Sequence, residues 1–133
     1  MSDCIFCKIV KKEIPSKIVY EDKISFAFLD IKPYNLGHTL VIPKKHYRWV
    51  WDIKEIGEFF KSVNKVANAI RKGLKTEFVV SLIVGEEVPH AHVHLVPRFK
   101  DDGHGSAIKL GNFKNISEKD QLEALSKIKK YLK

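Results

Sequence analysis

The sequence predicts an α+β domain built on a mostly antiparallel five-stranded sheet, with one long helix and a short C-terminal helix. Five short runs are rich in β-branched and aromatic residues, and the first three are joined by short connections. One longer stretch has helical periodicity instead. Because no repeat, low-complexity tract or Gly/Ser linker divides the 133 residues, we expect a single domain over residues 1–133.

Five segments are the candidate strands. Residues 18–20 and 25–29 form a predicted hairpin, residues 39–42 a third strand that Pro43 ends, residues 78–84 a fourth and residues 90–96 a fifth. The fourth run is apolar almost throughout, which predicts a strand buried on both faces. A loop over residues 30–37 separates the hairpin from the third strand.

Two segments have helical periodicity. The long one places apolar residues on one face: Ile53, Ile56, Phe59, Phe60, Val63, Val66, Ala67 and Ile70. Asp52 is predicted to cap this helix, with Glu55 as its capping-box partner, and Gly73 to end it. A C-terminal extension over about residues 115–133 contains a shorter helix. Ser117 is its predicted cap, and its narrow apolar stripe comprises Leu122, Leu125, Ile128 and Leu132.

The charge pattern favours a solvated, lysine-rich surface. The formal net charge is +8, but only three arginines are present, although arginine is the residue best suited to bidentate phosphate and base contacts. We therefore expect no specific nucleic-acid partner. No apolar run approaches the roughly 20 residues that span a bilayer. No signal-peptide pattern follows Met1, so we expect a cytoplasmic protein with reduced cysteines and no membrane partner.

Three histidines alternate with apolar residues in His90-Ala91-His92-Val93-His94. On a strand such residues share one face, and three imidazoles on one face are difficult to explain as packing. Two chemistries are compatible with them. Histidine binds metals, but three positions along one strand span about 13 Å, so two could share an ion more easily than three. Alternatively, a neutral imidazole attacks phosphorus while its neighbours donate hydrogen bonds to phosphate oxygens or to the leaving group.

Two cysteines stand near the N-terminus. The spacing Cys4-Ile5-Phe6-Cys7 lets both thiolates reach one zinc ion. A pair of buried, unligated thiols is the alternative. A thioredoxin-like redox role is less favoured, because no strand precedes the pair.

The histidine row resembles the signature of the histidine-triad (HIT) family. Several further segments are similar to those of the family: residues 4–9, 13–15, 28–31, 37–43 and 97–98. The resemblance covers about residues 3–99, implies a HIT-like fold, and is closest to the Hint-like branch, which has an N-terminal CxxC zinc site.

The resemblance implies an enzyme that cleaves a purine nucleoside phosphate derivative, either a phosphoramidate or a dinucleoside polyphosphate. His92 would be the nucleophile that carries the nucleotidyl group, with His94 and His38 in the catalytic site. Water would then hydrolyse the intermediate, and no Mg²⁺ would be required.

The resemblance also implies a nucleotide-binding site. Asp30 would accept hydrogen bonds from the ribose hydroxyls, although it could instead cap a turn. The apolar slot for the base would comprise Ile5, Phe6, Ile9, Ile14, Phe28, Ile31 and Leu40. For most of these seven residues, ordinary core packing is almost equally expected.

Relatives of this kind take two further zinc ligands from positions that correspond to His46 and His90. The resemblance thus implies a structural Zn²⁺ held by Cys4, Cys7, His46 and His90. His104, in a glycine-rich stretch, is expected at the surface. Much of the family forms homodimers in which the long helix and a central strand pair across a two-fold axis, so a homodimer is expected here.

The sequence departs from the family pattern before the triad. Ser81 stands where the family has asparagine, and Gly85 is followed by Glu86 and Glu87 where it has glutamine and a small hydroxyl residue. In the family that pair binds the phosphate region. A carboxylate beside phosphate is repulsive by a few kcal/mol at an effective dielectric near 20. The glutamates could point away, act as protonated acids, or mark altered catalysis. A catalytically weakened nucleotide-binding or scaffold protein is therefore the alternative function.

Overall fold

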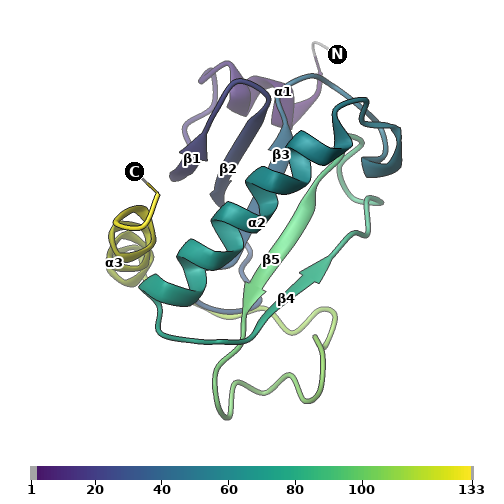
Figure 1. Cartoon of the computed structure of the whole chain (residues 1–133). Coiled ribbons are helices and arrows are strands. Elements are labelled where there is room, and N and C mark those ends of the chain that lie inside the picture. The colour runs from purple at the N-terminus through teal and green to yellow at the C-terminus, as the bar shows by residue number, and fades with distance from the viewer. Residues whose placement is uncertain (1–2, 133) are drawn as a thin grey trace.

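The computed structural model describes residues 3–132, so both ends of the predicted domain, and Met1, lie outside the described residues. The elements are α1 (Ile5–Val10), β1 (Ile18–Glu21), β2 (Ser25–Leu29), β3 (Thr39–Pro43), the 3₁₀ helix η1 (Val50–Asp52), α2 (Ile56–Gly73), β4 (Val79–Leu82), β5 (Val93–Pro97) and α3 (Glu118–Lys129). The strands form one antiparallel sheet in the order β1-β2-β3-β5-β4, and α2 crosses one face of it (Figure 1). The predicted α+β fold with a five-stranded antiparallel sheet is confirmed.

The inner strands β2 and β3 are buried on both faces. Their side chains alternate, so that Ala27 and Val41 pack in the core cluster under α2. Phe26 and Phe28 pack instead with residues of α1 on the opposite face. Burying one Phe side chain contributes about 2 kcal/mol, so both faces of these strands help to hold the sheet together.

The predicted double burial of residues 78–84 is wrong. Among residues 3–132, β4 lies at the sheet edge and pairs only with β5, and the side chain of Ser81 is exposed. An apolar run predicts a strand, but its place in the sheet depends on which partners it pairs with, and the local pattern does not contain that information.

The start of the long helix also differs from the prediction. The backbone N–H groups of Asp52 and Ile53 bond to the carbonyls of Trp49 and Val50, which closes a 3₁₀ turn before α2 begins. Glu55 is therefore the N-cap and makes no capping hydrogen bond through its side chain, so the predicted capping box is absent.

The end of α2 packs closely against α3. Gly73 is the last residue of α2 rather than a stop beyond it. A Cβ atom at Gly73 would lie 2.6 Å from the backbone oxygen of Lys127 in α3. Gly73 is therefore required for the close approach of the two helices.

The predicted cap of the last helix is confirmed. The Ser117 hydroxyl accepts a hydrogen bond from the Asp120 N–H at 3.1 Å. Ile128 is fully buried, whereas Leu122 is exposed and Ala124 takes a buried position instead. Among residues 3–132, no helix is long and apolar enough to cross a membrane.

Candidate functional site

The triad lies on the face of the sheet opposite α2. His94 is in β5 beside Leu40, which belongs to the core cluster around α1. The ladder of β5 begins only at Val93, because β3 and β4 provide no partner before that residue. The prediction of one strand over residues 90–96 is therefore too long. The ring centroids of His92 and His94 lie 5.0 Å apart, whereas the ring of His90 contacts His46.

The hydrogen bonds of His92 determine its tautomer. Its Nδ1 lies 2.7 Å from the backbone oxygen of His90. A carbonyl oxygen can only accept, so Nδ1 carries the proton. Burial is the largest influence on the ring and lowers the pKa of His92, which keeps the ring neutral. The Nε2 lone pair of His92 is therefore free to act as a nucleophile.

A chain of hydrogen bonds determines the tautomers of His38 and His94. The Tyr34 N–H donates to Nδ1 of His38 at 2.9 Å, so the proton of the neutral His38 ring is on Nε2. That Nε2–H donates to Nδ1 of His94 at 3.0 Å, which leaves the proton of His94 on Nε2. Burial lowers the pKa of His38 to about 3 and that of His94 to about 4, so both rings are neutral.

Asp30 lies beside this pair. One of its oxygens is 3.5 Å from Nε2 of His38 and 4.0 Å from Nδ1 of His94. The three groups are close enough to hold a metal ion. A neutral His38 whose Nδ1 accepts a hydrogen bond has its proton on Nε2, however, so that nitrogen has no lone pair for a metal. The tautomer favours a hydrogen-bonded cluster here.

The four predicted zinc ligands come together in the structure. Nδ1 of His90 lies 3.3 Å from Sγ of Cys4 and 3.5 Å from Sγ of Cys7. Nδ1 of His46 lies 3.3 Å from Sγ of Cys7. Tetrahedral zinc separates sulfur and nitrogen ligands by about 3.5 Å, so these distances fit one ion.

The orientation of the His90 ring also fits a metal centre. Its Nε2 lies 2.9 Å from the backbone oxygen of Pro43 and therefore carries the proton. Nδ1 is left with a lone pair that faces the two sulfurs, and an outer hydrogen bond of this kind is usual for histidine ligands of metals.

A pocket of about 340 Å³ opens in front of His92 and His94. It is lined by His92, His94, Asp30, Glu86 and Glu87, together with apolar side chains. Burial raises the pKa of Asp30, and the charge of Glu87 raises it further. Glu86 and Glu87 therefore lie at the same pocket as His92, which argues against the alternative in which they point away from it.

A second pocket adjoins the first, because Phe6 and Asp30 line both. Six of the seven predicted base-slot residues line this second pocket: Ile5, Phe6, Ile9, Ile14, Phe28 and Ile31. Leu40 lines the histidine pocket instead. Phe6, Ile9 and Phe28 are also core residues, whereas Ile31 is 90% exposed and is available for contact with a ligand.

Gly85 fixes the backbone of the loop before the triad. Its φ is +82°, which favours glycine, and a Cβ atom there would lie 3.0 Å from the ring of Trp49. The carbonyl of Gly85 accepts a hydrogen bond from Arg48 at 2.7 Å. This loop therefore enters the pocket in a defined conformation.

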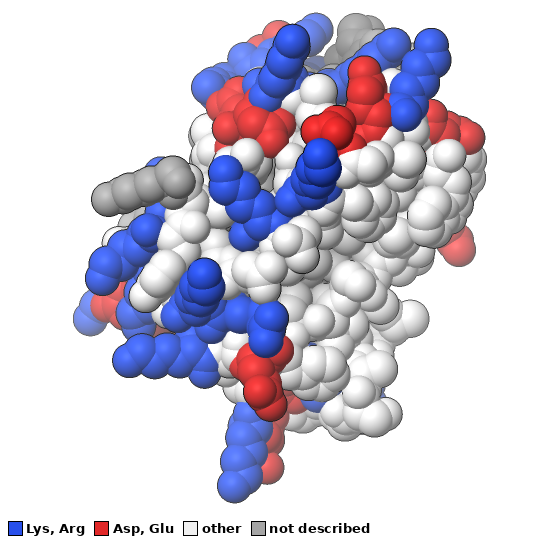
Figure 2. Space-filling view, in the orientation of Figure 1, with Lys and Arg blue, Asp and Glu red and all other residues white. Residues whose placement is uncertain are grey.

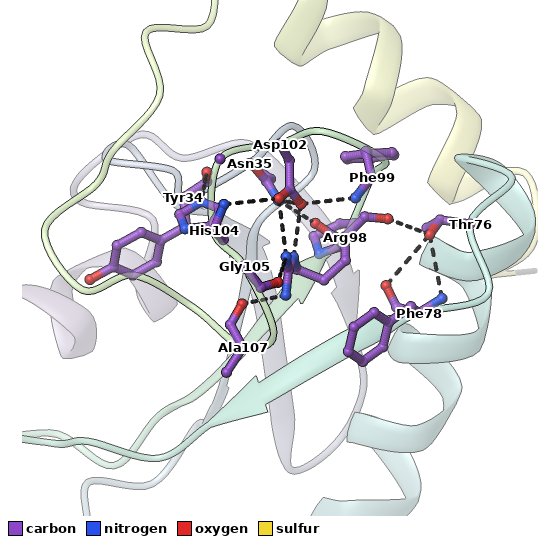
Figure 3. A network of polar contacts seen from close by, with 12 residues as sticks. Tyr34, Asn35, Thr76, Phe78, Arg98, Phe99, Asp102, His104, Gly105 and Ala107 are labelled. Atoms are coloured by element: carbon purple, nitrogen blue, oxygen red, sulfur yellow. Dashed lines mark hydrogen bonds and ion pairs between the residues drawn. The ribbon is translucent and has the colours of Figure 1, made fainter.

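A polar network after β5 supports the site and was not predicted from the sequence (Figure 3). Asp102 accepts hydrogen bonds from Arg98 at 2.8 and 3.1 Å and from Asn35 at 2.9 Å. The hydrogen bond from Arg98, with a smaller contribution from that of Asn35, holds the pKa of Asp102 far below its usual range. The network joins residues 98–114 to the loop that carries Tyr34 and His38.

The expectation that His104 lies at the surface is wrong. His104 is 6% exposed, and its Nε2 donates to the backbone oxygen of Tyr34 at 2.8 Å. The Tyr34 ring stacks between His38 and Phe113, at centroid distances of 5.5 and 4.8 Å. Phe113 and Leu110 line the histidine pocket, although they lie beyond residue 99, where the predicted family resemblance ends.

Comparisons with known proteins agree with this geometry. The HIT domain model matches residues 11–101. An uncharacterized HIT-like protein of Methanocaldococcus jannaschii is 44% identical, over 95% of this chain and 98% of that protein. Adenosine 5′-monophosphoramidase of Saccharomyces cerevisiae is 42% identical, over 77% of this chain and 66% of that protein.

Solved structures are similar along nearly the whole chain. A zinc-bound histidine triad family protein from Mycobacterium smegmatis has a TM-score of 0.76 at 29% identity, and the match covers 97% of this chain and 95% of that chain. The motifs, the fold and the family match lead to one conclusion: the chain belongs to the HIT domain family.

Proposed function

We propose that the protein hydrolyses or transfers the nucleotidyl group of a purine nucleoside phosphate derivative, of the phosphoramidate or dinucleoside polyphosphate type, through a nucleotidyl-His92 intermediate. The observation that carries the proposal is the neutral His92 ring, whose Nε2 is free while Nδ1 is held by the His90 carbonyl. The similarity to a yeast protein named adenosine 5′-monophosphoramidase supports the phosphoramidate class.

The order of the pockets supports a specific placement of the substrate. The base would occupy the slot beside α1, and Asp30, which lines both pockets, would accept the ribose hydroxyls. Phosphorus would then lie in front of His92. The Nε2–H of the neutral His94 would donate to a phosphate oxygen, a role in which losing one donor typically costs about 100-fold in kcat.

The reaction on a phosphoramidate has two balanced steps. Nε2 of His92 bonds to phosphorus, the P–N bond to the amine breaks, and the leaving nitrogen takes the electron pair of that bond and a proton from solvent. Water then forms a P–O bond, the P–Nε2 bond breaks with its electrons returning to His92, and one proton passes to solvent. The net reaction consumes one water and yields a nucleoside monophosphate and an amine. The hydrogen-bond donors are protein groups, so the proposal requires no Mg²⁺.

The donor set also fits a structural zinc ion, which Cys4, Cys7, His46 and His90 would hold. Bound there, Zn²⁺ would supply structural cross-linking and no catalytic chemistry. The residues around it tie the start of α1 to the segment just before β5.

The test uses adenosine 5′-phosphoramidate and intact-mass analysis of the quenched protein. We expect hydrolysis to AMP, a transient adenylyl adduct on the parent protein, and neither adduct nor turnover with His92→Ala. Full hydrolysis by His92→Ala would overturn the mechanism. Nucleotide binding without turnover in the parent protein would favour the weakened or scaffold function instead.

We further propose that the protein forms a homodimer through β4. This strand is at the edge of the sheet, and Phe78 and Ile83 beside it are 49% and 38% exposed. Figure 2 shows few charged side chains at the lower right of the view, on the side of β4, whereas Lys and Arg gather near α3. A second copy paired there would make the edge strand a central strand of a joined sheet.

A further inference from the structure

We propose that the mouth of the histidine pocket selects an amine leaving group that has an apolar stem and a distal positive charge. The inference rests on the proposed function and narrows it, because it favours cationic phosphoramidates over dinucleoside polyphosphates, whose leaving groups are anionic. It also assigns a role to Glu86, Glu87 and Leu110.

The apolar part of this site comes from two separate segments. Leu110 and Phe113 reach the pocket from the segment after β5, and Val84 reaches it from the loop after β4. All three side chains are partly open to solvent, with exposed fractions of 68%, 44% and 48%. Apolar surface at a pocket mouth gains free energy when an apolar stem covers it.

The charges in the pocket oppose the overall charge of the protein. The chain has 24 basic against 16 acidic residues. The pocket is lined by three carboxylates, from Asp30, Glu86 and Glu87, and by one ammonium group, from Lys32. Arg48 is not among the lining residues: it bonds to the Gly85 carbonyl and stacks on Trp49, although its charge adds to the effect of burial in lowering the pKa of His92. The lining is thus acidic even though the phosphate that enters it is an anion.

The positions of the two glutamates indicate which part of the substrate they would contact. They lie on the loop directly before the triad, and neither lines the slot beside α1. With the nucleoside in that slot and phosphorus at His92, the loop faces the group that leaves. An ammonium group there is attracted by both carboxylates, whereas a second phosphate is repelled.

The segment that carries Leu110 and Phe113 is fixed in place. Arg98 donates to Asp102 and to the carbonyls of Gly105 and Ala107, which closes the loop on itself (Figure 3). The N–H of Lys114 bonds to the Pro33 carbonyl at 2.8 Å. The wall of the leaving-group site is therefore preorganised, which reduces the entropy cost of binding.

The test uses adenosine 5′-phosphoramidates of three amines of matched length: hexylamine, 1,5-diaminopentane and 5-aminopentanoate. The unsubstituted phosphoramidate is the reference substrate. We expect kcat/KM at low salt to be about tenfold higher for the diaminopentane conjugate than for the aminopentanoate conjugate, with hexylamine between them. In a Glu86→Gln/Glu87→Gln double variant the ratio should fall to within about twofold. Glu123→Gln removes an exposed carboxylate of α3 and should leave the ratio unchanged.

The apolar stem has its own readout. Leu110→Ser should lower kcat/KM for the hexylamine conjugate relative to the reference by about threefold or more. If the reference substrate is hydrolysed through His92 but the three conjugates react equally, the leaving-group inference is wrong and the proposed function stands. If the ratio persists in the double variant, the assignment to the glutamates is wrong. If no phosphoramidate is hydrolysed, the proposed function fails and the inference fails with it.

Discussion

The backbone oxygen of His90 lies 2.7 Å from Nδ1 of His92, while the ring of His90 faces the sulfurs of Cys4 and Cys7. One residue thus contributes its carbonyl to the proposed nucleophile and its ring to the proposed metal centre. A change at the proposed metal centre should therefore reach His92 through the backbone of a single residue.

Cys7→Ser should reduce both zinc content and stability. We expect one Zn²⁺ per chain in the parent protein and much less in the variant. An ion present at a thousand times its Kd stabilises a fold by about 4 kcal/mol, so the unfolding midpoint should fall on substitution or chelation. Elemental analysis and thermal unfolding with and without chelator measure this. Equal metal content in both proteins would exclude the four-ligand site.

The buried histidines should make stability depend on pH. The unfolded chain binds protons on His38 and His94 below about pH 6.5, while the folded pKa values are about 3 and about 4. The unfolded state therefore holds more protons between these limits, and stability falls as pH decreases from about 6.5 towards 4. Each group contributes at most about 1.4 kcal/mol per pH unit.

His38→Asn provides the comparison, because its amide oxygen can still accept from Tyr34 but the side chain no longer titrates. The metal ligands are the same in both proteins, so their contribution cancels when the two slopes of unfolding free energy against pH are subtracted. Denaturant unfolding between pH 7 and pH 5 should show a shallower slope in the variant. Parallel slopes would mean that His38 is not held neutral by burial.

Two glycines of α2 allow a paired test of the close packing between α2 and α3. In Gly73→Ala the new Cβ would meet the backbone of Lys127 at 2.6 Å, and backbone cannot move aside cheaply. We expect a loss of about 1–3 kcal/mol despite the better helix propensity of alanine. Gly57→Ala lies in the same helix with nothing within 4 Å, so it should gain up to about 1 kcal/mol. Chemical denaturation that gives both variants the same sign would contradict this packing.

Asp102→Asn should weaken the loop that closes the histidine pocket. The side chains of Arg98 and Asp102 are only 7% and 6% exposed, so the guanidinium would lose a buried ionic partner. Hydrogen bonds to charged groups contribute about 2 kcal/mol each, and we expect a loss of this size. Asp101→Asn, at an exposed neighbour, should change stability by less than about 0.5 kcal/mol. Hydrogen exchange of residues 103–114 would report whether the loop opens in the first variant alone.

The sequence predicted those parts of the site that depend on local spacing or on family motifs. For example, the CxxC and triad motifs together predicted that the His90 ring faces the cysteines while His92 and His94 lie together in the pocket. The role of the segment after β5 depends instead on contacts across the chain, such as the bond from His104 to the carbonyl of Tyr34, 70 residues away. A histidine among glycines gives no local sign of that burial.

The same distinction holds for the fold. The periodic face of α2 predicted four of its buried residues, Phe59, Val63, Val66 and Ile70, because one helix face meets one sheet. It did not include Ser62 and Ala69, which are also buried. The edge position of β4 and the 3₁₀ turn before α2 were not predictable, because strand order and a turn of three residues depend on tertiary packing.

The open edge of β4 leads to the last prediction, which concerns assembly. Ile83 follows this strand and is 38% exposed, so a charge there should prevent a second copy from pairing with the edge. We expect Ile83→Lys to be a monomer by analytical ultracentrifugation at concentrations where the parent protein is a dimer. Leu122→Lys places the same charge on α3, at an apolar residue that is 48% exposed. Because α3 contacts β1, which is the sheet edge opposite β4, this variant should stay dimeric. If Leu122→Lys dissociates and Ile83→Lys does not, the interface is on α3 and the proposal is wrong, because an interface through β4 would respond to the charge at Ile83.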